Sequence, residues 1–307
     1  MIFKNYFNPK KTMRLVGLHE RFNFFKKLIL EEKFPQALIF SGDKGLGKST
    51  LIFHLMYYYF DKQNYDEKKN LIIKENYIFK QINENLYPGI IYLNGSKLKN
   101  IKIDDVRNLR TDLLKTSFTK KRFIILDDVE LFNMNSLNAL LKVIEEPGKN
   151  NYFILINNQT KPILATIKSR CLEVKLIMSD NEKKQITNTL LNYFKLEEML
   201  DQNLIAVSPG NFLRINHFFV EKKINIEDDP ISNLSKILNL YKKEKDIFYR
   251  DLLLFFVDYY LIINKSRKTS NSKKFIENRS FVVKNINDFF LYNLSQNTLL
   301  NSLEDSF

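Results

Sequence analysis

A glycine-rich loop at Gly42–Ser49 constrains this chain of 307 residues more than any other feature. The loop reads GDKGLGKS and fits the pattern G-x-x-x-x-G-K-[ST] at every fixed position. The apolar run Ala37–Ser41 before it predicts a strand, and Thr50–Phe60 after it predicts a helix. In this context backbone N–H groups and the positive end of the helix dipole face an anion. The loop therefore predicts a nucleotide-binding α/β domain.

The pattern assigns a role to each of its positions. The glycines let the backbone approach phosphate oxygens, Lys48 would reach the β- and γ-phosphates, and Ser49 would place its hydroxyl on Mg²⁺. We therefore expect ATP and Mg²⁺ as the ligands. The nucleotide contacts are expected at Gly42, Gly45, Gly47, Lys48, Ser49 and Thr50.

A second apolar run, Phe123–Leu126, ends in two carboxylates, Asp127 and Asp128. With the loop upstream, Asp127 is predicted to act on Mg²⁺ through water, although a turn-capping aspartate would give the same pattern. Active ATPases of this type usually carry Glu at the second position, where it orients the attacking water. Asp128 is shorter by one methylene, and a misplacement near 1 Å can cost on the order of a hundredfold in rate. Asp128 is therefore expected to be a weak catalytic group, and the sequence supports binding better than hydrolysis.

Strands and helices alternate through the first half of the chain. The strands expected at Ile90–Leu93 and Tyr152–Ile156, with helices at Ile103–Leu114 and Ser136–Glu146, favour a parallel sheet with crossover helices. The later part shows only helical patterns. We expect a nucleotide-binding domain at 1–175, a small helical lid at 176–224 and an all-helical collar for oligomerisation at 225–307.

The later helices are marked by capping signals and apolar stripes. They are expected at Ser179–Lys195, Leu196–Ala206, from Ser208 onward, Leu234–Lys242, Phe248–Asn264 and Phe275–Leu294. The most apolar run, Leu252–Asn264, is too short for a bilayer span of about 20 residues, so no membrane association is expected.

The composition is basic, with a formal net charge of +13. This charge favours attraction to nucleic acid. The same charge is equally expected of a chain that is rich in Lys, Asn and Ile because its coding sequence is AT-rich. The question of contact with DNA therefore stays open. Cys171 is the single cysteine, which excludes an internal disulfide and a cysteine zinc site, and favours a reducing, cytoplasmic location.

The order of several segments resembles one family. The segments are GDKGLGKS, IDDVRNL, FIILDDVELFNMNSLNALLKVIEEP, YFILINN and TIKSRC. This order is similar to bacterial clamp-loader subunits of the AAA+ class, and most like delta-prime of DNA polymerase III. The resemblance covers Pro9–Lys175, and beyond it rests on helical content and on the Ser208–Gly210 turn.

The resemblance implies a hetero-pentamer with gamma/tau and delta subunits that places a sliding clamp on primed DNA. Arg170, in the SRC segment, would enter the neighbour's ATP site and act in trans as an arginine finger. Asn157 falls at the family's sensor-1 position, and Arg214 falls near sensor 2. The family often has a zinc module before its second strand, but Asp61–Gly89 has no cysteine, so zinc is not expected.

Three interpretations follow. The leading one is a delta-prime-like subunit that binds ATP, has weak or no ATPase activity of its own, and donates Arg170 to a neighbour. The second is an active gamma/tau-like motor subunit. The third is another AAA+ nucleic-acid remodeller, such as a replication initiator or a Holliday-junction motor.

Overall fold

The computed structural model describes residues 7–73, 77–96, 113, 120–246, 248–267 and 272–304. The helix expected at Ile103–Leu114 lies outside the described residues except for Leu113. The chain divides into two compact units. The first comprises residues 2–190 and 208–211, and the second comprises 191–207 and 212–307.

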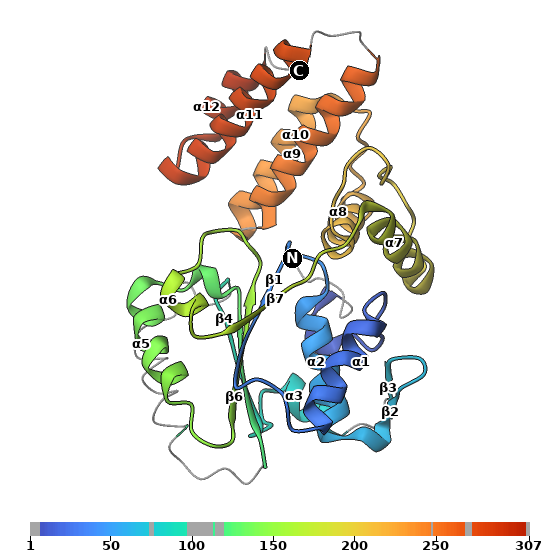
Figure 1. Cartoon of the computed structure of the whole chain (residues 1–307). Coiled ribbons are helices and arrows are strands. Elements are labelled where there is room, and N and C mark those ends of the chain that lie inside the picture. The colour runs from blue at the N-terminus through green and yellow to red at the C-terminus, as the bar shows by residue number, and fades with distance from the viewer. Residues whose placement is uncertain are drawn as a thin grey trace. The chain divides into compact units, whose positions relative to one another are not determined.

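The first unit is built on a five-stranded parallel sheet with the order β4-β5-β6-β1-β7 (Figure 1). Its central strands are buried on both faces, which explains why they read as continuous apolar runs. The strands are β1 Ala37–Ser41, β4 Ile90–Asn94, β5 Arg122–Asp127, β6 Asn151–Asn157 and β7 Leu172–Lys175.

Helices cover both faces of this sheet (Figure 1). On one face an apolar cluster that includes Phe25, Phe40 and Phe53 joins the sheet to α1 and α2. On the other face, Leu126 and Leu140 belong to a second cluster beneath α5 and α6. These helices are α1 His19–Leu30, α2 Lys48–Phe60, α3 Tyr77–Asn83, α5 Met134–Glu145 and α6 Ala165–Lys168. The helix α7, Asp180–Phe194, follows β7 and ends in the second unit. The α/β fold class with a parallel sheet is confirmed.

A short antiparallel hairpin lies between α2 and β4, within Asp61–Gly89, where the sequence analysis expected no zinc module. It consists of β2 Tyr65–Asp66 and β3 Leu71–Ile72. Tyr65 is buried, and its hydroxyl lies 2.9 Å from Nδ1 of His54 in α2. Nε2 of His54 lies 3.0 Å from the carbonyl oxygen of Thr12. Burial lowers the pKa of His54 to about 3, so this histidine is a neutral core residue.

The second unit contains helices only. They are α8 Pro209–Lys222, whose first residues belong to the first unit, α9 Pro230–Glu244, α10 Phe248–Arg267, α11 Ser272–Tyr292 and α12 Gln296–Leu303. Phe219 of α8 stacks on Phe256 of α10 with 6.1 Å between ring centroids. Asp258, which interrupts the apolar run of α10, receives two bonds from the guanidinium of Arg279, at 2.6 and 2.8 Å.

The helix expected at Leu196–Ala206 is wrong, because the chain there is irregular. The side chain of Asn216 accepts hydrogen bonds from the N–H groups of Met199 and Leu200 and donates to the carbonyl of Glu197. The hydroxyl of Tyr259 accepts a bond from the N–H of Asp201. Side chains distant in sequence thus satisfy backbone groups that a helix would otherwise pair.

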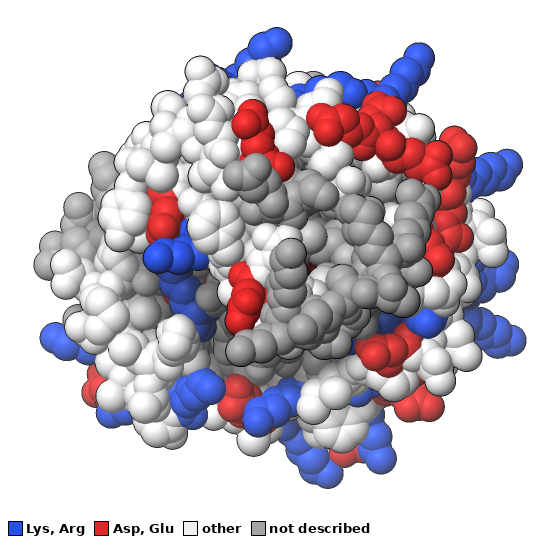
Figure 2. All heavy atoms as spheres, turned by 90° about the horizontal axis from the view of Figure 1, so that it is seen from above, with Lys and Arg blue, Asp and Glu red and all other residues white. Residues whose placement is uncertain are grey.

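The surface carries both signs of charge. On the face shown in Figure 2, Lys and Arg side chains are interspersed with Asp and Glu. The described residues of this face therefore form no single basic patch, and the two interpretations of the net charge stay open. None of the helices that the structure describes is long and apolar enough to cross a membrane.

Candidate nucleotide-binding site

The loop between β1 and α2 depends on its glycines. Gly45 and Gly47 have φ angles of 89° and 85°, in the left-handed region that favours glycine. A Cβ atom on Gly45 would clash with the hydroxyl of Ser208 and lie 2.8 Å from the backbone nitrogen of Asn211. The loop is therefore restricted to glycine by both conformation and space.

Lys48 begins α2 and is only 2% exposed. Its Nζ donates to the carbonyl oxygens of Gly42 at 2.6 Å and Asp43 at 2.7 Å. Among the described residues it has no ion pair with a carboxylate. Burial lowers the pKa of Lys48 to about 8, against the opposing effect of nearby acidic groups, Asp127 foremost. A buried ammonium paired only with neutral carbonyls is costly, and an anionic ligand would relieve this cost.

Asp127 lies at the end of β5, opposite the start of α2. Its Oδ2 accepts hydrogen bonds from the hydroxyls of Ser49 and Tyr92, both at 2.9 Å. Its Oδ1 accepts from the N–H of Asp128 at 3.0 Å. Burial, reinforced by the charge of Asp128, raises the pKa of Asp127 to about 6. The structure thus brings together the hydroxyl and the carboxylate that the sequence assigned to Mg²⁺.

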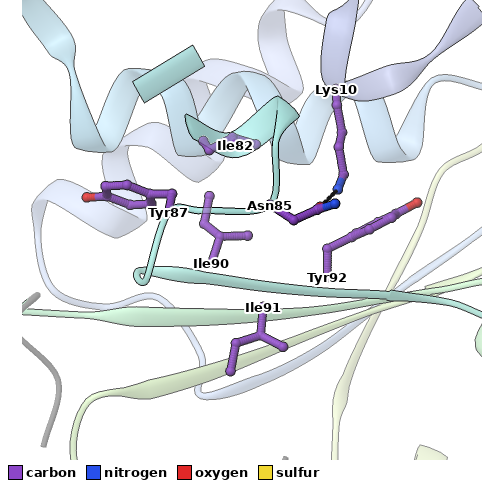
Figure 3. A pocket seen from close by; sticks show the side chains of 7 residues that line it. All are labelled: Lys10, Ile82, Asn85, Tyr87, Ile90, Ile91 and Tyr92. Atoms are coloured by element: carbon purple, nitrogen blue, oxygen red, sulfur yellow. Dashed lines mark hydrogen bonds between the residues drawn. The ribbon is translucent and has the colours of Figure 1, made fainter. Parts of the chain in front are cut away.

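Tyr92 was missed by the sequence analysis. It lies on β4, and its phenol reaches Asp127 on the neighbouring strand β5. Lys10 lies over the Tyr92 ring, with its Nζ 4.0 Å from the centroid and 2.5 Å from Oδ1 of Asn85 (Figure 3). These residues line a cavity of about 240 Å³, while Ile91 points to the opposite side of the strand (Figure 3). Strand alternation and the parallel register could have suggested Tyr92, but only once β4 and β5 were known to be neighbours.

Asp128 follows in the left-handed region, with φ of 51°, and caps a single 3-10 turn at Val129–Leu131. Its Oδ1 accepts a hydrogen bond of 2.7 Å from the amide of Asn158. Glu130 is also buried, and its Oε1 accepts bonds from the N–H of Asn158 and the hydroxyl of Thr160. Both carboxylates are thus engaged by the loop after β6, and Asn158 is a second residue that the sequence analysis missed.

Asn157 ends β6 directly opposite Ser41, the last residue of β1. Its side chain donates to the hydroxyl of Ser41 at 3.2 Å and accepts from the N–H of Gln159 at 3.0 Å. Its carbonyl accepts from the N–H of Gly42, also at 3.2 Å. Asn157 therefore lies beside the start of the glycine loop, and its sensor-1 role stays a prediction.

Ser208 and the first residues of α8 form hydrogen bonds with the glycine loop. The Ser208 hydroxyl and the Asn211 amide both donate to the carbonyl of Lys44, at 2.5 and 3.1 Å. The N–H of Gly210 donates to the carbonyl of Gly45 at 2.9 Å. These hydrogen bonds couple the conformation of the loop to the position of the start of α8.

Three predicted site residues remain. Thr50 lies in the first turn of α2. Arg214 belongs to the second unit, where its guanidinium carbon lies 4.7 Å from the centroid of the Phe248 ring. Arg170 follows α6, and its Nε donates to Oε1 of Glu145 at 2.6 Å.

The single cysteine, Cys171, directly follows Arg170 and is half-buried. Burial raises the pKa of its thiol to about 11.

The sequence comparison identifies the family. A family model described as "DNA polymerase III, delta subunit" matches residues 17–180, more than half of the chain. The chain belongs to this family. The predicted resemblance to clamp-loader subunits of the AAA+ class is thereby confirmed.

Three relatives illustrate the similarity. DNA polymerase III subunit gamma of Buchnera aphidicola subsp. Acyrthosiphon pisum is 28% identical over 72% of this chain and 62% of its own length. DNA polymerase III subunit tau of Bacillus subtilis is 28% identical over 67% of this chain and 34% of its own length. DNA polymerase III subunit delta' of Buchnera aphidicola subsp. Schizaphis graminum is 24% identical over 78% of this chain and 67% of its own length. The chain thus spans less than two thirds of the first two relatives, and the family includes both gamma/tau and delta' names.

Proposed function

We propose that this family member is a delta-prime-like clamp-loader subunit that binds ATP with Mg²⁺ at Gly42–Ser49. In this proposal it works in a hetero-pentamer with gamma/tau and delta subunits, which places a sliding clamp on primed DNA in the cytoplasm. The three predicted domains would then be a nucleotide-binding domain, a lid and a collar. The family match favours this proposal over an unrelated AAA+ remodeller.

The buried ammonium of Lys48 is the observation that carries nucleotide binding. The ammonium is buried, and the atoms that accept its hydrogen bonds are two backbone carbonyl oxygens. A buried cation is more stable when a negatively charged group contacts it directly. Phosphate oxygens at the start of α2 would give the ammonium an ionic partner in direct contact. The same ligand would accept bonds from the N–H groups of the loop.

The residues at the end of β5 fit Mg²⁺ that arrives with a nucleotide. This ion keeps most of its water and needs only one or two protein oxygens in addition to phosphate oxygens. Ser49 and Asp127 offer a hydroxyl and a carboxylate that already lie 2.9 Å apart. When bound, Mg²⁺ would neutralise charge on the phosphates.

The surroundings of Asp128 favour the delta-prime-like role over the motor role. Its side chain is short, buried and bonded to the Asn158 amide. A base that must orient water needs an available oxygen at the right distance. The intact glycine loop and the relatives named gamma and tau favour the second candidate, an active motor subunit.

The substitution Lys48→Ala tests nucleotide binding. We expect the affinity for a fluorescent ATP analogue to fall by roughly ten- to a hundredfold, since a hydrogen bond to a charged group contributes about 1.5–3 kcal/mol. The melting temperature without nucleotide should change little, because the loss of two hydrogen bonds to carbonyl oxygens is offset by removal of a buried, desolvated ammonium. Lys44→Ala, at a variable position of the same loop, is the control and should bind as the parent does.

Two results would contradict the proposal. Equal nucleotide affinity in Lys48→Ala and the parent would refute the binding site. Capture of the tagged chain from its native cells without gamma/tau or delta subunits would refute the assembly.

A further inference from the structure

The Glu-Glu-Pro sequence at the end of α5 is not explained by the apolar face of that helix. Glu145 is the last residue of α5, where the helix dipole presents its negative end. A carboxylate is unfavourable at this position unless a cation compensates it. Arg170, from a different part of the chain, supplies that cation.

The guanidinium of Arg170 is held from two sides. Nε donates to Oε1 of Glu145 at 2.6 Å, and Nη1 donates to the carbonyl of Thr166 at 3.0 Å. Nη1 also lies 3.4 Å from the Ser169 hydroxyl. Nη2 has no hydrogen bond within the described part of the chain. The arrangement fixes the plane of the guanidinium and leaves one nitrogen for another acceptor.

The pair is accessible to a second molecule. The side chains of Arg170 and Glu145 are 38% and 45% exposed. A pair as exposed as this contributes little to folding stability. The pair instead orients the guanidinium. An arginine that is already ordered loses less side-chain entropy when it binds a phosphate.

We propose that Glu145 is a positioning residue for Arg170. It holds the guanidinium so that Nη2 is presented to the γ-phosphate of ATP bound by a neighbouring subunit. This inference rests on the proposed trans role of Arg170. Glu145 itself does not touch the nucleotide.

The test is the ATPase rate of the complete clamp loader, assembled with its native partner subunits, a sliding clamp and primed DNA. Glu145→Gln keeps the size of the side chain but removes its charge. We expect kcat to fall about three- to tenfold with KM unchanged, since misorientation affects the chemical step more than nucleotide binding. Glu145→Asp, which keeps the charge, should recover part of the rate.

Glu146→Gln is the matched control. Glu146 is the adjacent exposed carboxylate, and it makes no hydrogen bond or ion pair with the described residues. This variant should hydrolyse ATP at the parent rate. In the Arg170→Ala background, Glu145→Gln should cause no further loss, because the two residues act as one unit.

The outcomes separate the inference from the proposed function. An unchanged or faster rate in Glu145→Gln, with a slow Arg170→Ala variant, would overturn the positioning role alone. Partial losses in the two single variants that combine in full in the double variant would do the same. A normal rate in Arg170→Ala would overturn the trans role itself, and the positioning role with it.

Discussion

At the scale of single residues, Lys48 links the sequence pattern to the chemistry of the site. The pattern predicted a lysine for phosphates, and the structure adds that its ammonium is buried with a pKa near 8. A phosphate would favour the charged form and raise that pKa again. Nucleotide binding above about pH 8 should therefore take up a proton.

This linkage gives a prediction for the pH dependence of affinity. Because the complex holds more protons than the free protein, the affinity for ATP should weaken as pH rises above about 8, by up to tenfold per unit. Calorimetry in buffers of different ionisation enthalpy would measure the proton uptake directly. In Lys48→Arg the guanidinium stays protonated, so any remaining binding should lose this dependence. Equal parent affinity at pH 7.5 and 9.5 would contradict the prediction.

The residues of the glycine loop could be predicted because their chemistry depends on local sequence spacing. Tyr92 and Glu145 could not be predicted, since each acts on a partner from a distant segment. The Tyr92 phenol on β4 donates a hydrogen bond to Asp127 on the neighbouring strand β5. Glu145 meets Arg170 because α5 and α6 lie on the same face of the sheet (Figure 1).

At the scale of elements, the buried parallel strands were predicted best. Their continuous apolar runs are distinctive, and β1 has the predicted bounds, Ala37–Ser41. The edge strand β7 was missed, because none of its residues is buried: Leu172 and Lys175 are exposed, and the two between them are half-buried. The segment 196–206 had helical composition, but Asn216 and Tyr259 hold its backbone in another conformation. Local patterns fail where distant side chains supply the hydrogen bonds.

The contact between α8 and the glycine loop leads to a prediction for Gly210→Ala. Alanine is better than glycine in a helix by about 1 kcal/mol. Here, however, its Cβ would lie 2.8 Å from the carbonyl oxygen of Gly45. Overpacking of this kind costs about 1–3 kcal/mol, so we expect a net loss of stability.

Thermal unfolding with and without nucleotide would measure this loss. Ser208→Ala is the control, because it removes one bond to the loop without adding an atom in the way. A melting temperature for Gly210→Ala above that of the parent would contradict the predicted overpacking of the added Cβ against the glycine loop.

At the scale of the whole molecule, the chain combines a sheet-based unit with a helical one. The predicted division into nucleotide-binding, lid and collar domains stays a prediction. The helix α8 begins in the first unit and continues in the second.

The delta-prime-like role predicts a low ATPase rate for the isolated chain. Typical enzymes turn over at about 1–10³ per second. With Asp128 in place of the usual glutamate, we expect the purified chain to bind ATP but to hydrolyse it on the order of a hundredfold more slowly. Asp128→Glu in the isolated chain tests whether length limits the reaction. Steady-state turnover by the parent within the typical range would favour the motor role.

The burial of Cys171, which directly follows Arg170, affects the reactivity of the single thiol. Burial keeps Cys171 almost wholly protonated, with roughly one thiolate in ten thousand at pH 7. Peroxide and alkylating reagents react with the thiolate, so we expect slow reaction at this sulfur. Titration of the native protein with a thiol reagent should show Cys171 reacting more slowly than a free cysteine.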